Sequence, residues 1–415
     1  MRVTVARVGQ LGDGIVQAEG GTIYAPGLLP GEVAEGDLDG NPLTNLRILT
    51  PSVHRVRPPC AHARTCGGCL MQHADDGFVA RWKEGIVRGA LEGQGLEAPM
   101  LPSVTSPPRS RRRATLTGRK TKSGVLLGFH ARGSDTVVPI PQCQLLHPDL
   151  IAGLPALESL VRLGATRTQE VHLTLTRSLD GADVQVTGGK PLDGASRMDL
   201  ARLAEAQGLA RLTWSGETVA LRAHPRQRMG RAQVTPPPGA FLQATEEGEA
   251  ALVQGVLAAL GPARRVADLF AGCGTFALPL AERAEVHAVE GEAAMVQALE
   301  RAARAAVGLK RVSAETRDLF RRPLEPDELA GFDAVVMDPP RAGAEAQTEV
   351  LARARVPVIA YVSCNPASFA RDARVLVAAG YALDWVQMVD QFRWSAHVEL
   401  VARFTFAKAG PARGM

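Results

Sequence analysis

Cys364 is the residue of this chain best placed to do chemistry. It lies just after the apolar run 358–362 and just before Asn365 and Pro366, a pair that stops a strand and opens a helix. A thiol at the mouth of a strand is exposed enough to act as a nucleophile. The alternative is a buried structural thiol, which is common for cysteine, but the neighbouring Asn-Pro pair argues against simple burial.

Two carboxylates fall near the same place. A second apolar run, 334–337, ends in Asp338, which is followed by two prolines and Arg341. Glu399 stands at the start of the last apolar run of the chain. A carboxylate within reach of a nucleophile can act as a general base, whereas the alternative for Glu399 is an ordinary solvated strand end. We therefore take Cys364 as a candidate nucleophile and Glu399 as a candidate base.

The elements that must position these residues form a regular pattern from about residue 240 onward. Apolar strands alternate with amphipathic helices, which predicts a doubly wound parallel sheet of the α/β class. The last two runs, 383–389 and 398–406, are joined by a loop too short for a parallel crossover, so we expect them to pair antiparallel. The other elements predicted here are a helix at 245–260 and strands at 266–270, 286–289, 334–337 and 358–362.

Such a sheet predicts where a ligand binds. Ligands of open parallel sheets lie outside the carboxyl ends of the strands. The antiparallel last strand begins at that same edge, which brings Glu399 near it. The residues expected at this edge are Asp268, Glu290, Asp338, Cys364 and Glu399.

A glycine turn follows the first strand of the sheet. Gly272 and Gly274 allow the backbone to approach a ligand, and Glu290, about 20 residues further on, ends the next strand, where an acidic residue can bind ribose hydroxyls. A third phosphate-cradling glycine is absent, which disfavours a dinucleotide and favours a nucleoside-type ligand. A plain tight turn is the alternative.

At this point the last 175 or so residues resemble the class I, Rossmann-like S-adenosylmethionine-dependent methyltransferases, whose sheet has an antiparallel last strand. The resemblance implies that Gly272 and Gly274 flank the methionine part of the cofactor, that Glu290 binds its ribose and that Asp318 lies near its adenine. The remaining cofactor-binding residues expected on this basis are Phe270, Thr275, Asp338 and Gln243.

The pairing of a thiol with a base fits one particular methylation. Carbon 5 of uracil is a poor nucleophile until a thiolate adds to carbon 6, and a base must then remove the proton from carbon 5. The stretches 338–343 and 363–366 resemble the motifs of the RNA uracil-C5 methyltransferases, and 241–243 resembles the segment that opens their catalytic domain. The resemblance implies Cys364 as nucleophile and substrate contacts at Phe241 and Arg341.

One stretch departs from this family. The Phe-Pro-His-Thr segment of that family is replaced in this chain by Phe392, Arg393, Trp394 and Ser395. The departure leaves substrate contacts from 393–395 open, while the following His-Val-Glu stretch keeps Glu399 as the expected base.

Four cysteines predict a metal centre. Cys60, Cys66 and Cys69 are closely spaced around a Gly-Gly turn, and Cys143 follows far downstream. Four thiolates can hold zinc or an iron-sulfur cluster, and a three-plus-one spacing favours a [4Fe-4S] centre over two zinc-type pairs. The arrangement resembles the bacterial 23S rRNA branch of the family, which carries such a cluster.

The N-terminal half predicts two further domains. Residues 1–55 break into five short β-prone runs, typical of a small OB-like barrel that can bind nucleic acid, and they resemble a TRAM domain. Residues 56–235 read as a central α+β domain that carries the cluster, and residues 236–415 as the methyltransferase domain. A structural cap without a ligand is the alternative for the barrel.

Charge and composition permit RNA as the partner. The net charge is only +4, so a local cluster must provide the contact, and Arg111, Arg112 and Arg113 lie in the densest basic stretch. A merely solvated face is the alternative. No signal peptide or membrane-length apolar segment is seen, and six cysteines are too sparse for a disulfide scaffold, which favours a cytoplasmic protein without a membrane partner. No obligate protein partner is evident.

The sequence thus predicts an enzyme that methylates carbon 5 of a uridine in 23S rRNA, with S-adenosylmethionine and a [4Fe-4S] cluster as cofactors. A tRNA substrate is the alternative within the same class. A non-catalytic iron-sulfur RNA-binding protein is the alternative from another class.

Overall fold

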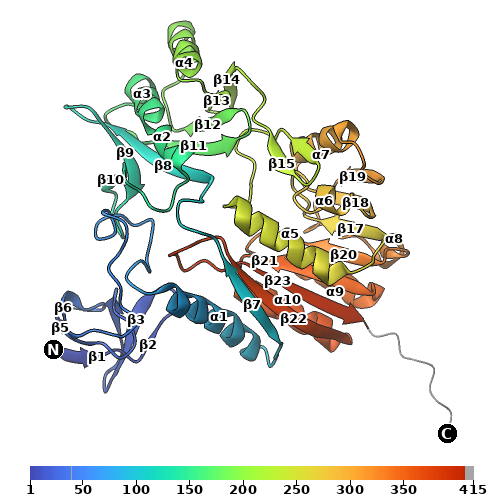
Figure 1. Ribbon diagram of the computed structural model, residues 1–415, viewed down its shortest axis with the longest axis horizontal. Coiled ribbons are helices and arrows are strands. Elements are labelled where there is room, and N and C mark those ends of the chain that lie inside the picture. The colour runs from blue at the N-terminus through green and yellow to red at the C-terminus, as the bar shows by residue number, and fades with distance from the viewer. Residues whose placement is uncertain (39, 407–415) are drawn as a thin grey trace.

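The computed structural model describes residues 1–38 and 40–406, and its N-terminal part consists of two three-stranded antiparallel sheets (Figure 1). The predicted run 2–8 is split, because the chain crosses from one sheet to the other at Val5 and Ala6, whose amides bond to Glu32 and Ile15. The strands are β1 (Arg2–Thr4), β2 (Arg7–Val8), β3 (Asp13–Ala18), β4 (Gly21–Pro26), β5 (Val33–Asp37) and β6 (Thr44–Thr50).

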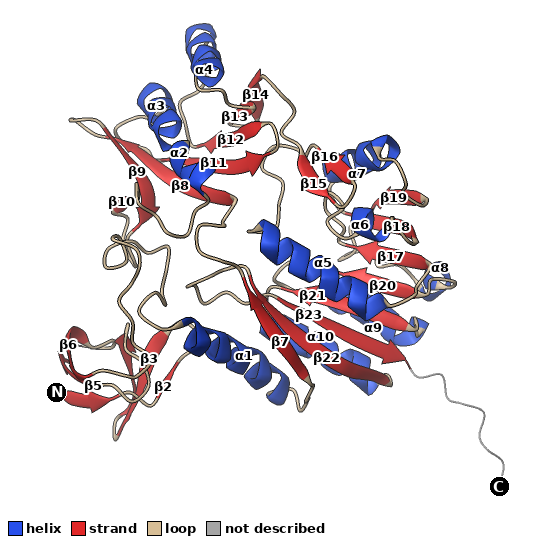
Figure 2. Ribbon diagram, viewed as in Figure 1, coloured by secondary structure: helices blue, strands red, loops and turns tan. Residues whose placement is uncertain are grey.

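The middle of the chain forms a seven-stranded mixed sheet covered by helices, as Figure 2 shows. Leu157, Leu160 and Leu200 of these helices are buried in its core. The strands, in spatial order, are β10 (Val137–Pro139), β9 (Val125–His130), β8 (Arg113–Lys120), β11 (Val171–Ser178), β12 (Gly181–Thr187), β13 (Arg211–Trp214) and β14 (Glu217–Leu221). The helices are α2 (Pro148–Ala152), α3 (Leu154–Gly164) and α4 (Gly194–Ala206), and the hairpin β15 (Gln227–Met229) and β16 (Ala232–Val234) follows.

The C-terminal part is the predicted α/β sheet, with eight strands. Its central strands are parallel, and the last strand in the chain, β23, lies antiparallel between β21 and β22, as expected for the final pair. The spatial order is β19 (Val312–Thr316), β18 (Glu285–Glu290), β17 (Arg265–Leu269), β20 (Ala334–Met337), β21 (Val358–Ser363), β23 (Leu400–Phe406), β22 (Tyr381–Asp390) and β7 (Met100–Thr105).

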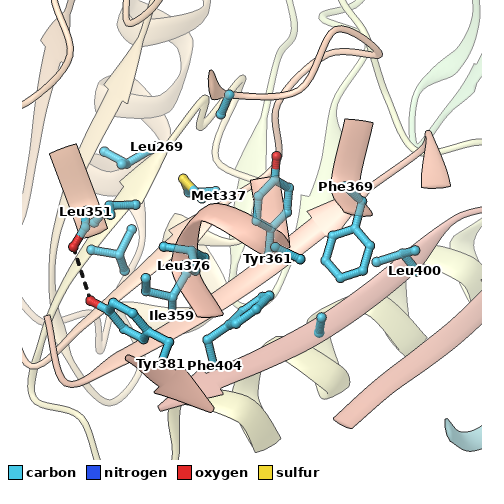
Figure 3. Close-up of a cluster of buried hydrophobic side chains, with 14 of the residues drawn as sticks. Leu269, Met337, Leu351, Ile359, Tyr361, Phe369, Leu376, Tyr381, Leu400 and Phe404 are labelled. Atoms are coloured by element: carbon cyan, nitrogen blue, oxygen red, sulfur yellow. Dashed lines mark hydrogen bonds between the residues drawn. The ribbon is translucent and has the colours of Figure 1, made fainter. Parts of the chain in front are cut away.

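Helices cover both faces of this sheet, and each face buries its own apolar core. On one face Tyr361, Phe369 and Phe404 pack together, and the Tyr381 hydroxyl donates a hydrogen bond to the Leu351 carbonyl (Figure 3). The helices of this face are α1 (Asp76–Glu92), α8 (Pro326–Leu329), α9 (Glu345–Ala354) and α10 (Pro366–Ala378). Those of the other face are α5 (Glu246–Leu260), α6 (Ala277–Leu280) and α7 (Ala293–Ala305).

The structure differs from the predicted domain boundary at one segment. Residues 76–105, expected within the central domain, pack on the C-terminal sheet: α1 buries Val87 and Leu91 against it, and β7 pairs in parallel with β22. β22 would otherwise leave a row of unpaired backbone groups at the sheet edge, which β7 satisfies. None of the helices in the described residues has the length and apolar character that crossing a membrane requires.

Candidate active site

Strand register brings the candidate nucleophile and base together. β20 and β21 run in parallel, with Met337 beside Tyr361, so Asp338 and Cys364 leave the sheet at the same edge. β23 is antiparallel to β21, with Ser363 beside Leu400, and the next pair outward is therefore Cys364 and Glu399. The sheet itself thus places a thiol and two carboxylates at one edge, as the sequence predicted.

The residue after the thiol fixes the turn that carries it. The Asn365 side chain caps α10 by accepting a hydrogen bond from the Ala367 amide at 3.1 Å. It also donates one to the Arg341 carbonyl at 2.8 Å, which ties the loop after β20 to the loop after β21. Cys364 is consequently held only partly buried at the top of the sheet.

Burial and like charge dominate the electrostatics of this edge. Burial raises the pKa of Glu399 to about 8, the charge of Asp338 acts in the same direction, and a hydrogen bond from Gln391 opposes both. Burial also raises the pKa of Asp338 to about 7. The pKa of Cys364 rises to about 11, first through burial and then through Glu399 and Asp338, while Arg341 lowers it.

Side-chain amides connect the two carboxylates. The Gln391 Nε2 group donates hydrogen bonds to the Glu399 carboxylate, at 3.0 Å, and to the Gln243 Oε1 atom. The Gln243 Nε2 group in turn donates to Asp338 at 3.3 Å. Gln243, Gln391 and Glu399 are all almost completely buried, so the chain of hydrogen bonds is shielded from water.

The glycine turn after β17 leaves room for a ligand. Gly272 has φ +56°, and a Cβ atom there would meet no atom within 4 Å, so its backbone borders open space. Gly274 has φ +100°, and its Cβ would meet Leu278 at 2.9 Å, so this glycine allows close packing under the turn. Phe270 opens the turn with φ +62°, unusual for a bulky residue and a mark of a functional turn.

Acidic side chains surround this turn. The Glu290 carboxylate accepts hydrogen bonds from the backbone amides of Gly272 and Glu292, both at 2.9 Å. Asp268, completely buried at the end of β17, has no hydrogen-bond partner for either carboxylate oxygen. Burial, then the charges of Asp338 and Glu290, raise its pKa well above the usual range.

This donor set fits S-adenosylmethionine. The cofactor carries a sulfonium and an ammonium group, and clustered carboxylates with an unsatisfied buried oxygen favour cations. Phe270 packs against the half-exposed ring of Phe320, with centroids 5.5 Å apart, and this pair provides an apolar surface for a base. Asp318 lies two residues before Phe320 and accepts its amide hydrogen, and Thr275 is half-buried in the glycine turn.

The basic stretch 111–113, which was expected to contact RNA, is not fully exposed to solvent. Arg112 is only 3% exposed, and its guanidinium donates to Glu249 and to the Gln243 carbonyl, so it braces the active site and offers no surface for phosphate. The sequence could not predict this because its partner Glu249 is remote in the chain. Arg111 packs over the Phe392 ring, and Arg113 bonds to the Gly239 carbonyl.

Phe241 and Arg341, the residues expected to contact the substrate, are both exposed to solvent. Phe241 exposes 60% of its surface. Arg341 lies 3.3 Å from the Nδ1 atom of the exposed His397. Phe241, Arg341 and His397 are therefore accessible to a ligand that enters from solvent.

Arg393 and Trp394, in the stretch that departs from the family pattern, contact distant parts of the chain. The Trp394 carbonyl accepts the amide hydrogens of Leu70 and Met71, and its buried ring packs in the central core. Arg393 pairs with Asp76 at the start of α1. These contacts hold the loop before Glu399.

The four predicted ligand cysteines converge. Cys60, Cys66, Cys69 and Cys143 line one cavity, which leaves about 310 Å³ free of protein atoms when space open to solvent is included. Burial raises the pKa of Cys66 and Cys143, and that of Cys69 to about 12. Among the described residues, no three such side chains are arranged to hold a single metal ion.

Gln391 and His397 are the site residues that the sequence analysis missed. A glutamine in a loop carries no chemical signature of its own, and Gln391 is recognisable only because it directly follows the strand that ends at Asp390. His397 lay within the stretch used to identify Glu399, so its nearness to the base was the one available signal.

Comparisons with known proteins agree with this geometry. Residues 237–403 match the family described as tRNA (Uracil-5-)-methyltransferase. An uncharacterized RNA methyltransferase of Brucella suis is 44% identical over 404 residues, covering 97% of each chain. The 23S rRNA (uracil(1939)-C(5))-methyltransferase RlmD of Pectobacterium atrosepticum is 33% identical, covering 97% of this chain and 93% of its own.

A solved structure shares the fold over nearly the whole chain. The Pyrococcus abyssi tRNA (uracil-54, C5)-methyltransferase, in complex with S-adenosyl-L-homocysteine, superposes with a TM-score of 0.76 at 22% identity, covering 98% of this chain and 99% of that one. With a thiol, a carboxylate and a cation-favouring pocket at one sheet edge, the chain belongs to the RNA uracil-C5 methyltransferase family and is an S-adenosylmethionine-dependent RNA methyltransferase.

Proposed function

We propose that this enzyme transfers a methyl group to carbon 5 of a uridine in 23S rRNA, with Cys364 as nucleophile and Glu399 as base. The observation that carries the proposal is the register of β21 and β23, which sets the thiol opposite the carboxylate. The glycine turn of the cofactor pocket lies at the same edge of the sheet, because β17 pairs with β20.

The residues divide the chemistry in two. The Cys364 thiolate adds to carbon 6 of uracil, which places the displaced electron pair in an enolate and makes carbon 5 nucleophilic. S-adenosylmethionine, when bound, supplies the methyl group. The Glu399 carboxylate then takes the proton from carbon 5, and the electrons of that bond reform the double bond and expel the Cys364 thiolate.

Burial keeps the Cys364 thiol unreactive in the resting site. The raised pKa of Cys364, about 11, leaves it a thiol at neutral pH, which limits reaction with stray electrophiles. The positive charge of Arg341 is the one influence from a neighbouring side chain that lowers this pKa. Arg341 therefore both borders the substrate entrance and favours the thiolate.

For the cofactor we propose contacts that follow from the pocket. Glu290 would bind the ribose, Asp318 and Phe270 would lie at the adenine, and Gly272, Gly274 and Thr275 would border the methionine part. Gln243 and Asp338 would hold its reactive end, because they connect the pocket with Glu399. The open space at Gly272 and the unsatisfied Asp268 carboxylate support this arrangement.

We propose that the four clustered cysteines hold a [4Fe-4S] centre. The support is that the four thiols line one shared cavity, since four cysteine thiolates are the usual ligands of such a cluster. Anaerobic purification followed by iron and sulfide analysis tests this. Four irons that are lost in a Cys69→Ser variant are expected, and zinc alone would contradict the cluster.

Ribosomal RNA as substrate rests on the RlmD relative, whose similarity extends over nearly the whole chain. A tRNA substrate is the second candidate, because the family description and the Pyrococcus structure both name tRNA. The two N-terminal sheets would act as a TRAM-like RNA-binding domain, since Arg2, Arg7 and Arg47 are exposed on them. With RNA as its substrate, we place the enzyme in the cytoplasm.

The test is methyl transfer from labelled S-adenosylmethionine to separate pools of unmodified 23S rRNA and tRNA, with mass spectrometry of the nucleosides. 5-Methyluridine in rRNA alone is the expected result. Label only in tRNA would overturn the substrate and keep the chemistry. No label in either pool would overturn the proposed function and favour a non-catalytic RNA-binding protein.

A further inference from the structure

The Gln391 side chain makes three hydrogen bonds within the active site, although the proposed reaction gives it no role. This side chain is 1% exposed and lies directly after β22, at the start of the loop that leads to Glu399. An amide side chain offers two donors and one acceptor oxygen. All of these are used here by Ala244, Gln243 and Glu399.

A backbone amide fixes which way the Gln391 side chain points. The Ala244 N–H group can only donate, and it lies 2.6 Å from the Gln391 Oε1 atom. The other amide orientation would set two donors against each other, so the NH₂ group must point at Glu399 and at the Gln243 Oε1 atom. The assignment of oxygen and nitrogen thus follows from chemistry.

The orientation of the Gln391 amide also fixes the orientation of the Gln243 amide. Because its Oε1 atom accepts from Gln391, its NH₂ group must face Asp338, to which it donates at 3.3 Å. One backbone N–H group therefore sets the direction of two amides, and both chains of donors end on carboxylates. An ionised carboxylate can only accept hydrogen bonds, so this polarity favours the charged forms of Glu399 and Asp338.

Packing holds Gln391 in this position. A Cβ atom at Gly248, near the start of α5, would come within 2.5 Å of the Gln391 Cβ atom. The absence of a side chain at 248 gives Gln391 its place between α5 and the sheet edge. Two elements from distant parts of the chain therefore confine one glutamine.

We propose that Gln391 is a positioning residue for the methyl transfer: it orients Glu399, favours the ionised form of that carboxylate for proton removal, and connects it through Gln243 to Asp338 in the cofactor pocket. The inference rests on the proposed role of Glu399 as the base. It assigns to the residue after β22 a role that neither the family motifs nor the sequence pattern indicated.

The groups around Glu399 predict the direction of a pH effect. Asp338, after β20, and the burial of the site disfavour its charged form, and the Gln391 hydrogen bond opposes them. Cys364, after β21, is a neutral thiol at neutral pH, and the charge of Arg341 acts on that thiol. Loss of the Gln391 donor consequently moves the ionisation of Glu399 to higher pH.

The test compares Gln391→Met with the wild-type enzyme across pH. A hydrogen bond to a charged group is worth about one to two powers of ten in an equilibrium. The variant should therefore lose about tenfold or more of its turnover at neutral pH and recover toward the wild-type rate as the pH rises. The covalent enzyme–RNA adduct should accumulate at neutral pH in the variant, because the step after methylation is slowed.

Gln387→Met is the matched control, since Gln387 lies on β22, the strand that Gln391 follows, and its side chain donates to the Pro102 carbonyl. It should show the wild-type pH profile. Gln391→Glu keeps the size of the side chain but adds a negative charge, so it should shift the pH profile of turnover further than Gln391→Met. If the methionine variant does not fold, the pH profile of Gln391→Glu tests the proposal. A loss of rate that is equal at every pH in both variants would overturn the proposal.

Failure of the proposed function gives a different result. If the wild-type enzyme formed no 5-methyluridine, or if Glu399→Gln turned over normally, Glu399 would not be the base, whatever Gln391 does. If the wild-type and Glu399→Gln enzymes behave as expected and only Gln391→Met leaves the pH profile unchanged, the positioning role alone is wrong.

Discussion

At the scale of single residues, a thiol and a carboxylate that are remote in the sequence become a catalytic pair because one strand runs against its neighbours. Had β23 run parallel to β21, Glu399 would begin its strand at the opposite edge of the sheet, far from Cys364. The antiparallel final strand is therefore a requirement of the proposed chemistry.

Replacing Glu399 by Gln should trap the covalent intermediate. The amide keeps the shape of the side chain but cannot accept the proton from carbon 5, so Cys364 stays bonded to the methylated base. A denaturant-resistant band of RNA and protein on a gel, with label from the methyl donor, is the expected observation. The double variant Glu399→Gln/Cys364→Ala should give no such band, and rapid turnover of the single variant would remove Glu399 as the base.

The same substitution should change how stability depends on pH. The pKa of Glu399 is raised from 4.5 to about 8 in the folded state, so folding favours its protonated form. This contribution is complete below about pH 4.5 and is lost as the pH rises toward 8. In urea unfolding, Glu399→Gln should therefore gain stability relative to the wild type between pH 5 and pH 8. An equal difference at both values would show that Glu399 titrates normally.

At the scale of elements, the two glycines of the turn after β17 have different tasks. Both have positive φ, which costs a residue with a side chain about 1–2 kcal/mol. At Gly272 a methyl group enters open space, whereas at Gly274 it meets Leu278 at 2.9 Å. Gly272→Ala should chiefly weaken S-adenosylmethionine binding, and Gly274→Ala should chiefly lower the unfolding temperature. Calorimetric titration and thermal unfolding distinguish them, and identical effects would contradict this division.

The alternating pattern predicted the elements of the C-terminal sheet because its strands are buried on both faces and its helices are amphipathic. Strand ends carry the chemistry in such a sheet, so Asp338, Cys364 and Glu399 could be placed from strand boundaries alone. Residues 100–105 could not be assigned to this sheet, since their partner strand follows some 280 residues later and leaves no local trace. The burial of Arg112 and the contacts of Gln391 were missed because Glu249 and Ala244, which bond to them, are 137 and 147 residues away in the chain.

At the scale of the whole molecule, the loop that follows β22 contacts the cysteine-bearing loop, helix α1 and the central region. Its Trp394 carbonyl accepts two amides from the cysteine-bearing loop, and Arg393 pairs with the start of α1. Arg111 packs on Phe392 from the central region. The loop that precedes Glu399 is thus held by residues next to the four cysteines.

The buried pair of Lys83 and Asp390 also holds this loop, at its start. Lys83 on α1 is completely buried, and its Nζ atom lies 2.7 Å from Asp390 at the end of β22 and 3.1 Å from the Phe392 carbonyl. Lys83→Met leaves a buried carboxylate without its counter-charge, which costs about 3–5 kcal/mol. The variant should also lose activity, because the loop to Glu399 starts at Asp390.

Guanidinium unfolding followed by tryptophan fluorescence measures this cost. Arg88→Met, on the exposed side of the same helix, is the control and should change stability by no more than about 0.5 kcal/mol. Adding Asp390→Asn to Lys83→Met removes the orphaned charge and should restore much of the stability, but not the position of the loop, so activity should stay low. Full activity in that double variant would show that α1 only covers the sheet and does not position the base.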